Sequence, residues 1–351
     1  MTDTTAAPTK VRRLSWIYPD RGTAWLRRAE EEGVWGPYRK VAADLGLELT
    51  LNKPEEVAVD ATDPARPKIY LDGDPVTPAD TIFVTSLYSL PHQTQDVCNQ
   101  LFLFTILERL GFYLPIPPAL SYIGEDKLAT VLHLADSPVP MLPTVRVGSG
   151  REAMAGHNDA ALAALPFPMI VKPAYWGMGL GISVVHNMHD LKGVIGLAGG
   201  SDTALVAQPY LPGVREQRVY VVDGQAHTVL YGVKDGYCLM VTKATGGRHE
   251  RGYSGLPAEL ADAVAYAAQR LPTPYFTLDF LHDGERHWIS EIELDGAVGF
   301  NGIPEQDAAG RDIVRARFQA YLAGHASRTA VGGDRTAVGG DGRPAAGEER
   351  R

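Results

Sequence analysis

The stretch TLDFLHDGERHWISEIELDG, residues 277–296, decides the fold of this chain. It holds two apolar runs on either side of a turn at Asp283-Gly284, and this pattern predicts two antiparallel strands. Pairing of the two strands would bring Asp279 beside Glu291 and Glu293. Three clustered carboxylates repel one another unless a cation lies between them, and hard oxygen ligands suit Mg²⁺ that is shared with substrate phosphates. The sequence therefore predicts a nucleotide enzyme.

Composition places the chain among ordinary soluble globular proteins. The chain is 45% hydrophobic and 21% charged, and its 351 residues are enough for two or three subdomains. A net charge of -9 without a basic stripe argues against a nucleic-acid partner. Cys98 and Cys238 stand far apart without metal-ligand spacing, so neither a disulfide framework nor a zinc site is expected. No signal-peptide core or membrane-length apolar run is present, so we expect a cytoplasmic protein without a membrane partner.

The first third of the chain alternates between extended and helical patterns. Strand-like runs are expected at Arg12–Asp20, at 48–52 and within Lys68–Val84. Helical periodicity covers Ala24–Leu45, and a helix buried on more than one side is expected over Asp96–Leu110. This order is typical of a small α/β layer domain.

The middle of the chain continues with helices and a glycine-rich turn. Helices are predicted at Gly124–Ala135 and near Arg151–Leu165. A strand at Met169–Lys172 then enters the turn at Tyr175–Gly181, and a second strand follows at Ile182–Val185. The turn lacks the GK[ST] ending of a Walker loop, and a strand follows it where a Walker loop would need a helix.

From Ser121 to Gly302 the motif order resembles the ATP-grasp superfamily, especially carboxylate–amine ligases of the RimK and D-alanine–D-alanine ligase kinds. Each motif is weak alone, but the order and spacing together make a strong signal. The motifs are a helix beginning with Asp126-Lys127, the strand FPMIVKP, the glycine loop YWGMGLGI, the hinge VAQPYLPG, the hairpin EQRVYVVDG and the Asp…Glu-x-Glu cluster. The resemblance implies an ATP-grasp fold of mixed α+β and α/β class, with nucleotide bound between two α+β subdomains.

The resemblance also implies a domain order. We expect a disordered lead at 1–10, an N-terminal α/β domain at 11–120, an ATP-grasp domain at 121–325 with a small lid subdomain at about 140–210 and a larger one at about 211–325, and a disordered tail at 326–351. The tail repeats RTAVGGD and is rich in glycine, a composition typical of disorder.

The nucleotide site implied by the resemblance combines cations, glycines and a hinge. ATP is highly negative, so Lys127 and Lys172 would contact its phosphates, and glycines permit close backbone approach. Glu216 would bind the ribose hydroxyls, while Pro209 removes one N–H donor from the hinge. The expected nucleotide-binding residues are Lys127, Lys172, Gly177, Gly179, Gly181, Gln208, Tyr210, Leu211 and Glu216.

Metal and catalytic residues follow from the same resemblance. Asp279, Glu291 and Glu293 would hold Mg²⁺, or Mn²⁺, against ATP. Arg218 would stabilise the acyl phosphate and developing oxyanion. The other expected catalytic residues are Lys243 and Arg248, and the expected substrate-facing residues are Asp295 and Asn301.

Two positions depart from the family pattern. Glu293 stands where the commonest pattern has asparagine, which makes the metal site more negative. Thr277 stands where D-alanine–D-alanine ligases place a catalytic arginine. Their particular substrate chemistry is therefore not expected here.

The activity implied by the resemblance is ATP-dependent amide-bond formation between small molecules, with amino acids as the leading candidates, through an acyl phosphate with release of ADP and phosphate. A RimK-type ligase or a macrocyclase acting on a peptide or protein is the alternative. A nucleotide-binding regulator without catalysis belongs to a different class, and the three intact acidic residues argue against it. The donor, the acceptor and a homodimeric state stay open.

Overall fold

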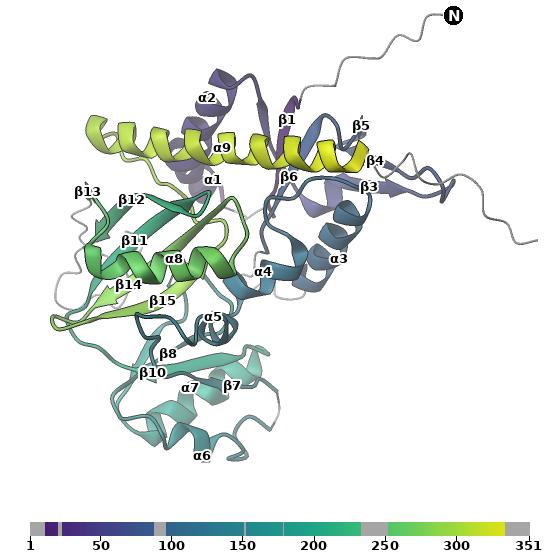
Figure 1. Cartoon of the computed structure of the whole chain (residues 1–351). Coiled ribbons are helices and arrows are strands. Elements are labelled where there is room, and N and C mark those ends of the chain that lie inside the picture. The colour runs from purple at the N-terminus through teal and green to yellow at the C-terminus, as the bar shows by residue number, and fades with distance from the viewer. Residues whose placement is uncertain are drawn as a thin grey trace, which may run out of the picture.

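The computed structural model describes residues 11–19, 23–87, 96–150, 152–177, 179–232 and 252–333. Figure 1 shows three tiers: the N-terminal sheets with α9 at the top, a five-stranded sheet with α8 in the middle, and a small sheet with α6 and α7 at the bottom. The predicted lead at 1–10 and the predicted catalytic residues Lys243 and Arg248 lie outside the described residues.

The N-terminal tier is built on a parallel sheet of order β2-β1-β6. All five residues of β6 (TIFVT) are buried, as expected of a parallel strand that is covered on both faces. A separate antiparallel sheet, β3-β4-β5, extends from this tier. The elements of the whole N-terminal tier are β1 (Arg13–Ile17), α1 (Ala24–Glu30), a π-helical turn (Glu31–Trp35), α2 (Gly36–Asp44), β2 (Glu48–Asn52), a 3₁₀ turn (Pro54–Glu56), β3 (Val57–Asp60), β4 (Lys68–Leu71), β5 (Asp74–Val76), β6 (Thr81–Thr85) and α3 (Asp96–Arg109).

The small lower sheet has the order β7-β10-β8-β9 and pairs antiparallel throughout. Two helices precede it in sequence, and α7 packs against its apolar face through buried Leu191 and Ile195. Its elements are α4 (Pro118–Glu125), α5 (Lys127–His133), β7 (Val145–Val147), α6 (Asp159–Leu162), β8 (Met169–Pro173), β9 (Ser183–Val185), α7 (Met188–Gly200) and β10 (Leu205–Pro209).

The central sheet has the order β13-β12-β11-β14-β15 and carries the residues of the opening motif. Alternate residues of its strands point into the core that α8 covers, and the others face the opposite side. Its elements are β11 (Arg215–Val222), β12 (Gln225–Gly232), β13 (Gly252–Ser254), a 3₁₀ turn (Ala258–Leu260), α8 (Ala261–Arg270), β14 (Tyr275–His282), β15 (His287–Glu293) and the long helix α9 (Pro304–Gly333).

Helix α9 joins the upper and central tiers. One hydrophobic core contains Trp16 and Tyr38 from the N-terminal region, Tyr220 and Tyr275 from the central sheet, and Phe318 from α9. Figure 1 shows α9 lying across both tiers. The position of the N-terminal region is therefore tied to the central sheet through one shared core.

The disordered tail was predicted to begin at residue 326, which is before the end of helix α9. Helix α9 continues through residues 326–333 and contacts the N-terminal region at His325 and Arg328. His325 contacts the Pro78 carbonyl at 2.8 Å, and Arg328 donates to the Glu108 carbonyl at 3.3 Å. Residues 334–351 lie outside the described part of the chain, and the other domain boundaries stay predictions.

Three helix predictions also need correction. The helix expected over Gly124–Ala135 is interrupted at Asp126, where the backbone is extended and the side-chain carboxylate caps α5 by accepting from the Leu128 and Ala129 amides. The helix near Arg151–Leu165 is reduced to α6, since turns occupy most of the residues before it. Helix α3 was expected to be buried on more than one side, yet Phe102 is 64% exposed.

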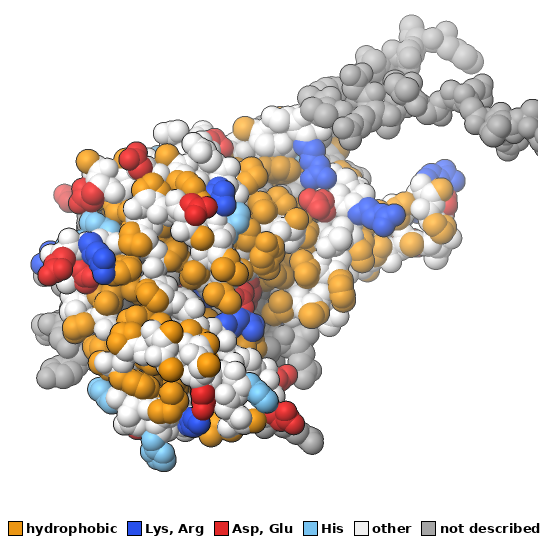
Figure 2. Space-filling view, turned by 60° about the horizontal axis from the view of Figure 1, so that its bottom comes forward, with side chains coloured by type: hydrophobic (Ala, Val, Ile, Leu, Met, Phe, Trp, Pro, Cys, Tyr) orange, Lys and Arg blue, Asp and Glu red, His pale blue; other side chains and the backbone are white. Residues whose placement is uncertain are grey.

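None of the helices in the described residues combines the length and apolar character that a membrane crossing needs. On the face shown in Figure 2, Lys and Arg side chains are scattered singly. Among the described residues, that face therefore has no basic stripe of the kind that follows a nucleic-acid backbone.

Gly296, just after β15, has no room for a side chain. A Cβ there would lie 2.5 Å from Cγ2 of Thr277, which is fully buried. We expect Gly296→Ala to destabilise the fold by about 1–3 kcal/mol through overpacking. Urea unfolding followed by circular dichroism measures this loss. Gly193→Ala in α7, where nothing lies within 4 Å, is the matched control and should be neutral or slightly stabilising; equal effects of both changes would contradict the packing argument.

Candidate functional site

The β14–β15 hairpin brings the three predicted metal ligands together. Asp279 pairs directly with Glu291, and Thr277 pairs with Glu293. Because side chains alternate along a strand, Glu291 and Glu293 project from the same face. One ligand oxygen from each of Asp279, Glu291 and Glu293 lies within 4.8 Å of the others.

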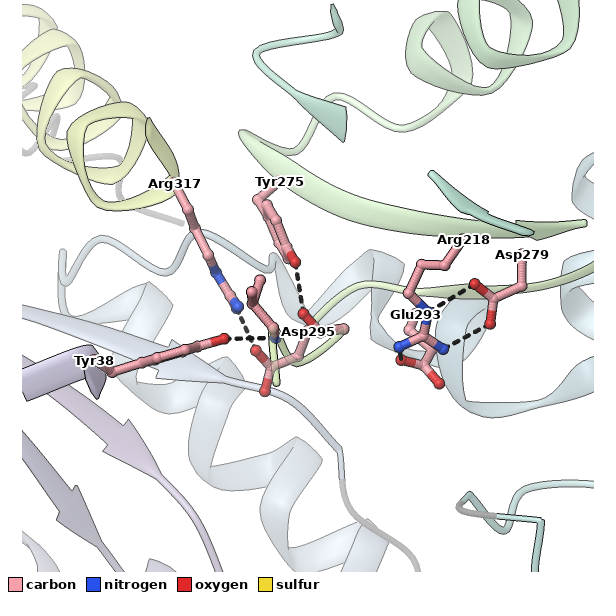
Figure 3. Close-up of polar contacts among 9 residues, drawn as sticks. Tyr38, Arg218, Tyr275, Asp279, Glu293, Asp295 and Arg317 are labelled. Atoms are coloured by element: carbon pink, nitrogen blue, oxygen red, sulfur yellow. Dashed lines mark hydrogen bonds and ion pairs between the residues drawn. The ribbon is translucent and has the colours of Figure 1, made fainter. Parts of the chain in front are cut away.

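Arg218 enters this cluster from the neighbouring strand β11, where it pairs with Asp279. Its Nε and Nη2 donate to the two oxygens of Asp279 at 2.8 and 2.6 Å, and its Nη1 lies 2.9 Å from Glu293. Figure 3 shows this guanidinium between the two carboxylates. A planar fork suits this bidentate geometry and fixes the orientation of Asp279.

Burial sets the electrostatics of the pair. The Asp279 side chain is only 1% exposed, and this desolvation raises its pKa, while the contacts with Arg218 act in the opposite direction. Burial lowers the pKa of Arg218, but Asp279 and Glu293 outweigh this effect and raise it well above its ordinary value. Arg218 compensates one of three carboxylate charges, so the cluster retains negative charge that a cation would neutralise.

The donor set fits Mg²⁺. All three candidate ligands are carboxylates, and hard oxygen donors of this kind are preferred by that ion. The metal role of Asp279, Glu291 and Glu293 stays a prediction, supported by their convergence on one side of the hairpin.

A cavity of about 330 Å³ opens beside the carboxylates of Glu291 and Glu293. Glu291 and Glu293 line it on one side, and Lys127, Trp176 and Gly177 line it on another. The N-terminal region supplies further aromatic and acidic lining residues, including Trp16, Tyr18, Trp35, Tyr38 and Glu30. The cavity therefore lies where the glycine loop, the hairpin carboxylates and the N-terminal region meet.

The two predicted phosphate-binding lysines lie close to the same loop. The Lys127 amide donates to the Ala174 carbonyl at 2.9 Å. Ala174 directly follows β8, the strand that carries Lys172. The Lys127 ammonium donates to the Trp176 carbonyl at 2.7 Å. Lys172 is 9% exposed and does not line the cavity.

The glycine loop joins β8 to β9 in a hairpin, as its sequence indicated. Gly179 and Gly181 have φ values of 69° and 72°, a region that favours glycine. A Cβ at Gly181 would lie 2.7 Å from Pro173, so the loop also needs glycine for space. Of the three predicted glycines, Gly177 lines the cavity.

The predicted hinge lies where the small sheet passes into the central sheet. Gln208 is buried, and its side-chain amide donates to Thr144 at 2.8 Å. The Tyr210 amide donates to the Pro168 carbonyl at 3.0 Å, so that donor is occupied in this conformation. Leu211 follows β10, and Glu216 lies two residues before Arg218 on the same face of β11. Adenine and ribose contacts at these residues stay predictions.

The two predicted substrate-facing residues have different positions. Asp295 lines the cavity, but its carboxylate accepts from Trp16 Nε1 at 3.0 Å and from Arg317. Asn301 is exposed and lies outside the cavity lining. Its side chain accepts from the Ile303 amide and donates to Gln306 at the start of α9. The structure therefore places Asn301 at a helix terminus and does not bring it to the substrate cavity.

Arg317 is the residue that the sequence reasoning missed. It lines the cavity from α9 and is fully buried. A signal was available: Val314, Arg317, Phe318 and Tyr321 follow the spacing of one helix face, so an arginine occurs where an apolar residue is expected.

Thr277 has a packing reason to be small. It is fully buried, and its side chain lies directly against Gly296. A longer side chain at 277 would displace the segment that follows Glu293. The packing agrees with the absence of an arginine at this position.

Comparisons with known proteins give similarities in sequence and in fold. Residues 132–237 match the family model described as "D-ala D-ala ligase C-terminus". The chain is 25% identical over 105 residues to a D-alanine–D-alanine ligase of a Nitratiruptor species, a match that covers 30% of this chain and 28% of that protein. The chain therefore spans less than a third of that relative's length.

Solved structures match over a larger part of the chain. The D-cycloserine synthetase DcsG matches with a TM-score of 0.57 at 17% identity, over 86% of this chain and 99% of that one. The ATP-grasp ligase PsnB, complexed with a minimal precursor, matches with a TM-score of 0.57 at 16% identity, over 88% of this chain and 99% of that one. At these identities the likeness establishes the fold and confirms the fold class predicted from the sequence.

Proposed function

Because this chain has the ATP-grasp fold and is similar in sequence to D-alanine–D-alanine ligases, we propose that it is an ATP-dependent carboxylate–amine ligase. Its proposed substrates are two small molecules, with amino acids as the leading candidates. The observation that carries this proposal is one cavity lined by both the glycine-loop region and the hairpin carboxylates. Phosphate-binding and metal-binding groups would then meet at the same reaction centre.

The proposed reaction has two steps. An oxygen of the substrate carboxylate attacks the γ-phosphorus of ATP, the bond to the β-phosphate oxygen breaks, and ADP leaves. The amine nitrogen of the second substrate then attacks the acyl carbon, phosphate leaves, and the amine loses a proton to give the amide. ATP is consumed because a carboxylate is a poor electrophile until its oxygen becomes part of a phosphate leaving group.

The protein groups mainly position the reactants and compensate charge. Lys127 and Lys172 would neutralise phosphate oxygens beside the glycine loop. Asp279, Glu291 and Glu293 would hold Mg²⁺, which when bound neutralises charge on the transferring phosphoryl group. Arg218 keeps Asp279 oriented through its bidentate contact and supplies positive charge next to the same centre.

The size of the cavity supports small substrates. A volume of about 330 Å³ is near the lower end of the range for small-molecule sites. The N-terminal region closes one side of the cavity with Trp16, Tyr18 and Trp35. The predicted cytoplasmic location and homodimer stay predictions.

An ADP-release assay over amino acids, singly and in pairs, tests this function, with mass spectrometry of the products. We expect turnover that depends on a pair and a product mass equal to the two substrates less one water. Turnover with peptides or proteins alone would favour the peptide-directed alternative. ATP binding without turnover on any substrate would favour a nucleotide-binding regulator and contradict the proposed ligase.

A further inference from the structure

The segment that follows the last metal ligand forms part of the cavity wall. This post-metal loop (residues 294–298) leaves β15 immediately after Glu293. Three of its residues, Leu294, Asp295 and Ala297, line the cavity. The position of the loop therefore decides the shape of the substrate space next to the carboxylate cluster.

Side chains from four separate elements hold the post-metal loop. Figure 3 shows Tyr38, Tyr275 and Arg317 converging on it. Tyr275 on β14 donates to the Gly296 carbonyl at 2.6 Å, and the Val298 amide donates to the hydroxyl of Tyr38 on α2 at 2.8 Å. The Asp295 carboxylate accepts from Trp16 on β1 at 3.0 Å and forms an ion pair with Arg317 on α9.

The guanidinium of Arg317 is itself held by several neighbouring side chains. Its guanidinium lies 3.9 Å from the centre of the Tyr275 ring and 4.6 Å from that of Trp16. Its Nε donates to the Tyr321 hydroxyl at 2.6 Å while its Nη2 contacts Asp295. A planar guanidinium can stack on rings and donate in two directions at once, which a lysine ammonium cannot reproduce.

A largely buried ion pair, such as that of Arg317 with Asp295, is weak evidence for a purely stabilising role. Desolvation of two charges offsets much of their attraction, and apolar residues of similar volume often stabilise a fold as well or better. The Asp295–Arg317 pair does, however, fix the direction of a loop that carries cavity residues directly after a metal ligand. That directional role is the one that an apolar replacement would lose.

We propose that Arg317 is a positioning residue for ligation, which acts through Asp295 to hold the post-metal loop as a fixed wall of the substrate cavity. The proposal rests on the proposed ligase function. It also assigns the C-terminal helix α9 a part in the reaction, although α9 contributes no predicted metal or nucleotide ligand.

Arg317→Lys is the test, because it retains the positive charge opposite Asp295 but loses the planar fork. With the amino-acid pair that gives the highest wild-type turnover, kcat/KM for the amino acids should fall by about tenfold or more, as expected for a displaced substrate. The KM for ATP should stay within about twofold of the wild-type value, because none of the side chains that hold the loop (Trp16, Tyr38, Tyr275 and Arg317) is a predicted nucleotide residue. This difference separates positioning from a general loss of folded protein.

Arg315→Lys is the matched control on the same helix. Arg315 forms a solvent-exposed ion pair with Asp44, and neither residue lines the cavity, so this change should leave all constants unchanged. Trp16→Phe is a milder second variant, which removes one hydrogen bond to Asp295 and retains an aromatic ring. It should shift the same constants in the same direction by a smaller factor.

Hydrogen exchange of the post-metal loop provides a readout that does not depend on activity. Amides of residues 295–298 should exchange faster in Arg317→Lys than in the wild type, while those of β8 stay unchanged. A folded Arg317→Lys protein with wild-type exchange in the loop would overturn the proposal, and so would unchanged amino-acid constants. Absence of turnover in the wild type would reject the ligase function instead, and loop exchange would still decide whether Arg317 holds this wall.

Discussion

Glu291→Gln is expected to reduce Mg²⁺-dependent ADP release by about 10³-fold or more, because several kcal/mol of charge stabilisation would be lost with the ion. Glu291 pairs with Asp279 across the hairpin and lines the cavity. An amide of the same size removes one negative charge from the three predicted metal ligands but preserves the shape of β15. We therefore expect Glu291→Gln to lower the Mg²⁺ affinity and the rate of ADP release while the protein stays folded.

The measurement is steady-state ADP release across a Mg²⁺ titration, together with the thermal unfolding midpoint. Glu285→Gln is the matched control, since Glu285 is exposed in the turn of the same hairpin. It should behave as the wild type in both measurements. Undiminished activity of Glu291→Gln at low Mg²⁺ would reject the metal assignment.

Arg218→Met is expected to lower both stability and activity. Asp279 would remain buried without its bidentate partner, and the loss of one member of a buried ion pair costs about 3–5 kcal/mol of unfolding free energy. The three carboxylates would also lose the guanidinium that orients Asp279 and contacts Glu293. ADP release should therefore fall more steeply than the folded fraction.

Urea unfolding and ADP release under conditions where the variant is fully folded separate the two effects. Arg215→Met is the control, because Arg215 is exposed at the start of the same strand. Arg218→Lys should recover part of the stability by retaining the charge, but little of the activity, because an ammonium cannot bind Asp279 bidentately. Stability equal to the wild type in Arg218→Met would contradict the inferred role of the pair.

Much of the central hairpin was predictable from local sequence. The apolar runs around Asp283-Gly284 specify two strands and a short turn, and the strand period of two then places Glu291 and Glu293 on one face. The glycine loop was predictable for a similar reason, since Gly179 and Gly181 adopt backbone angles that other residues rarely accept.

Helix boundaries were predicted less well because tertiary contacts override local pattern. The glycine-rich composition beyond residue 325 indicated disorder, but contacts of His325 and Arg328 with the N-terminal region accompany the continuation of α9 to Gly333. The apolar sequence of α3 indicated burial on several sides, yet nothing in it specifies which side the core covers. Phe102 remains largely exposed.

Short-range pattern was sufficient for the acidic cluster, because its members lie on one hairpin and strand geometry alone brings them together. The wall of the substrate cavity depended on the folded chain. Trp16 lies near the start of the sequence, whereas Asp295 and Arg317 lie near its end. The three residues meet only when α9 packs across the N-terminal tier and the central sheet. No local periodicity encodes such a contact. Burial of the shared apolar core brings α9 against the N-terminal region, and this packing places Arg317 beside Asp295.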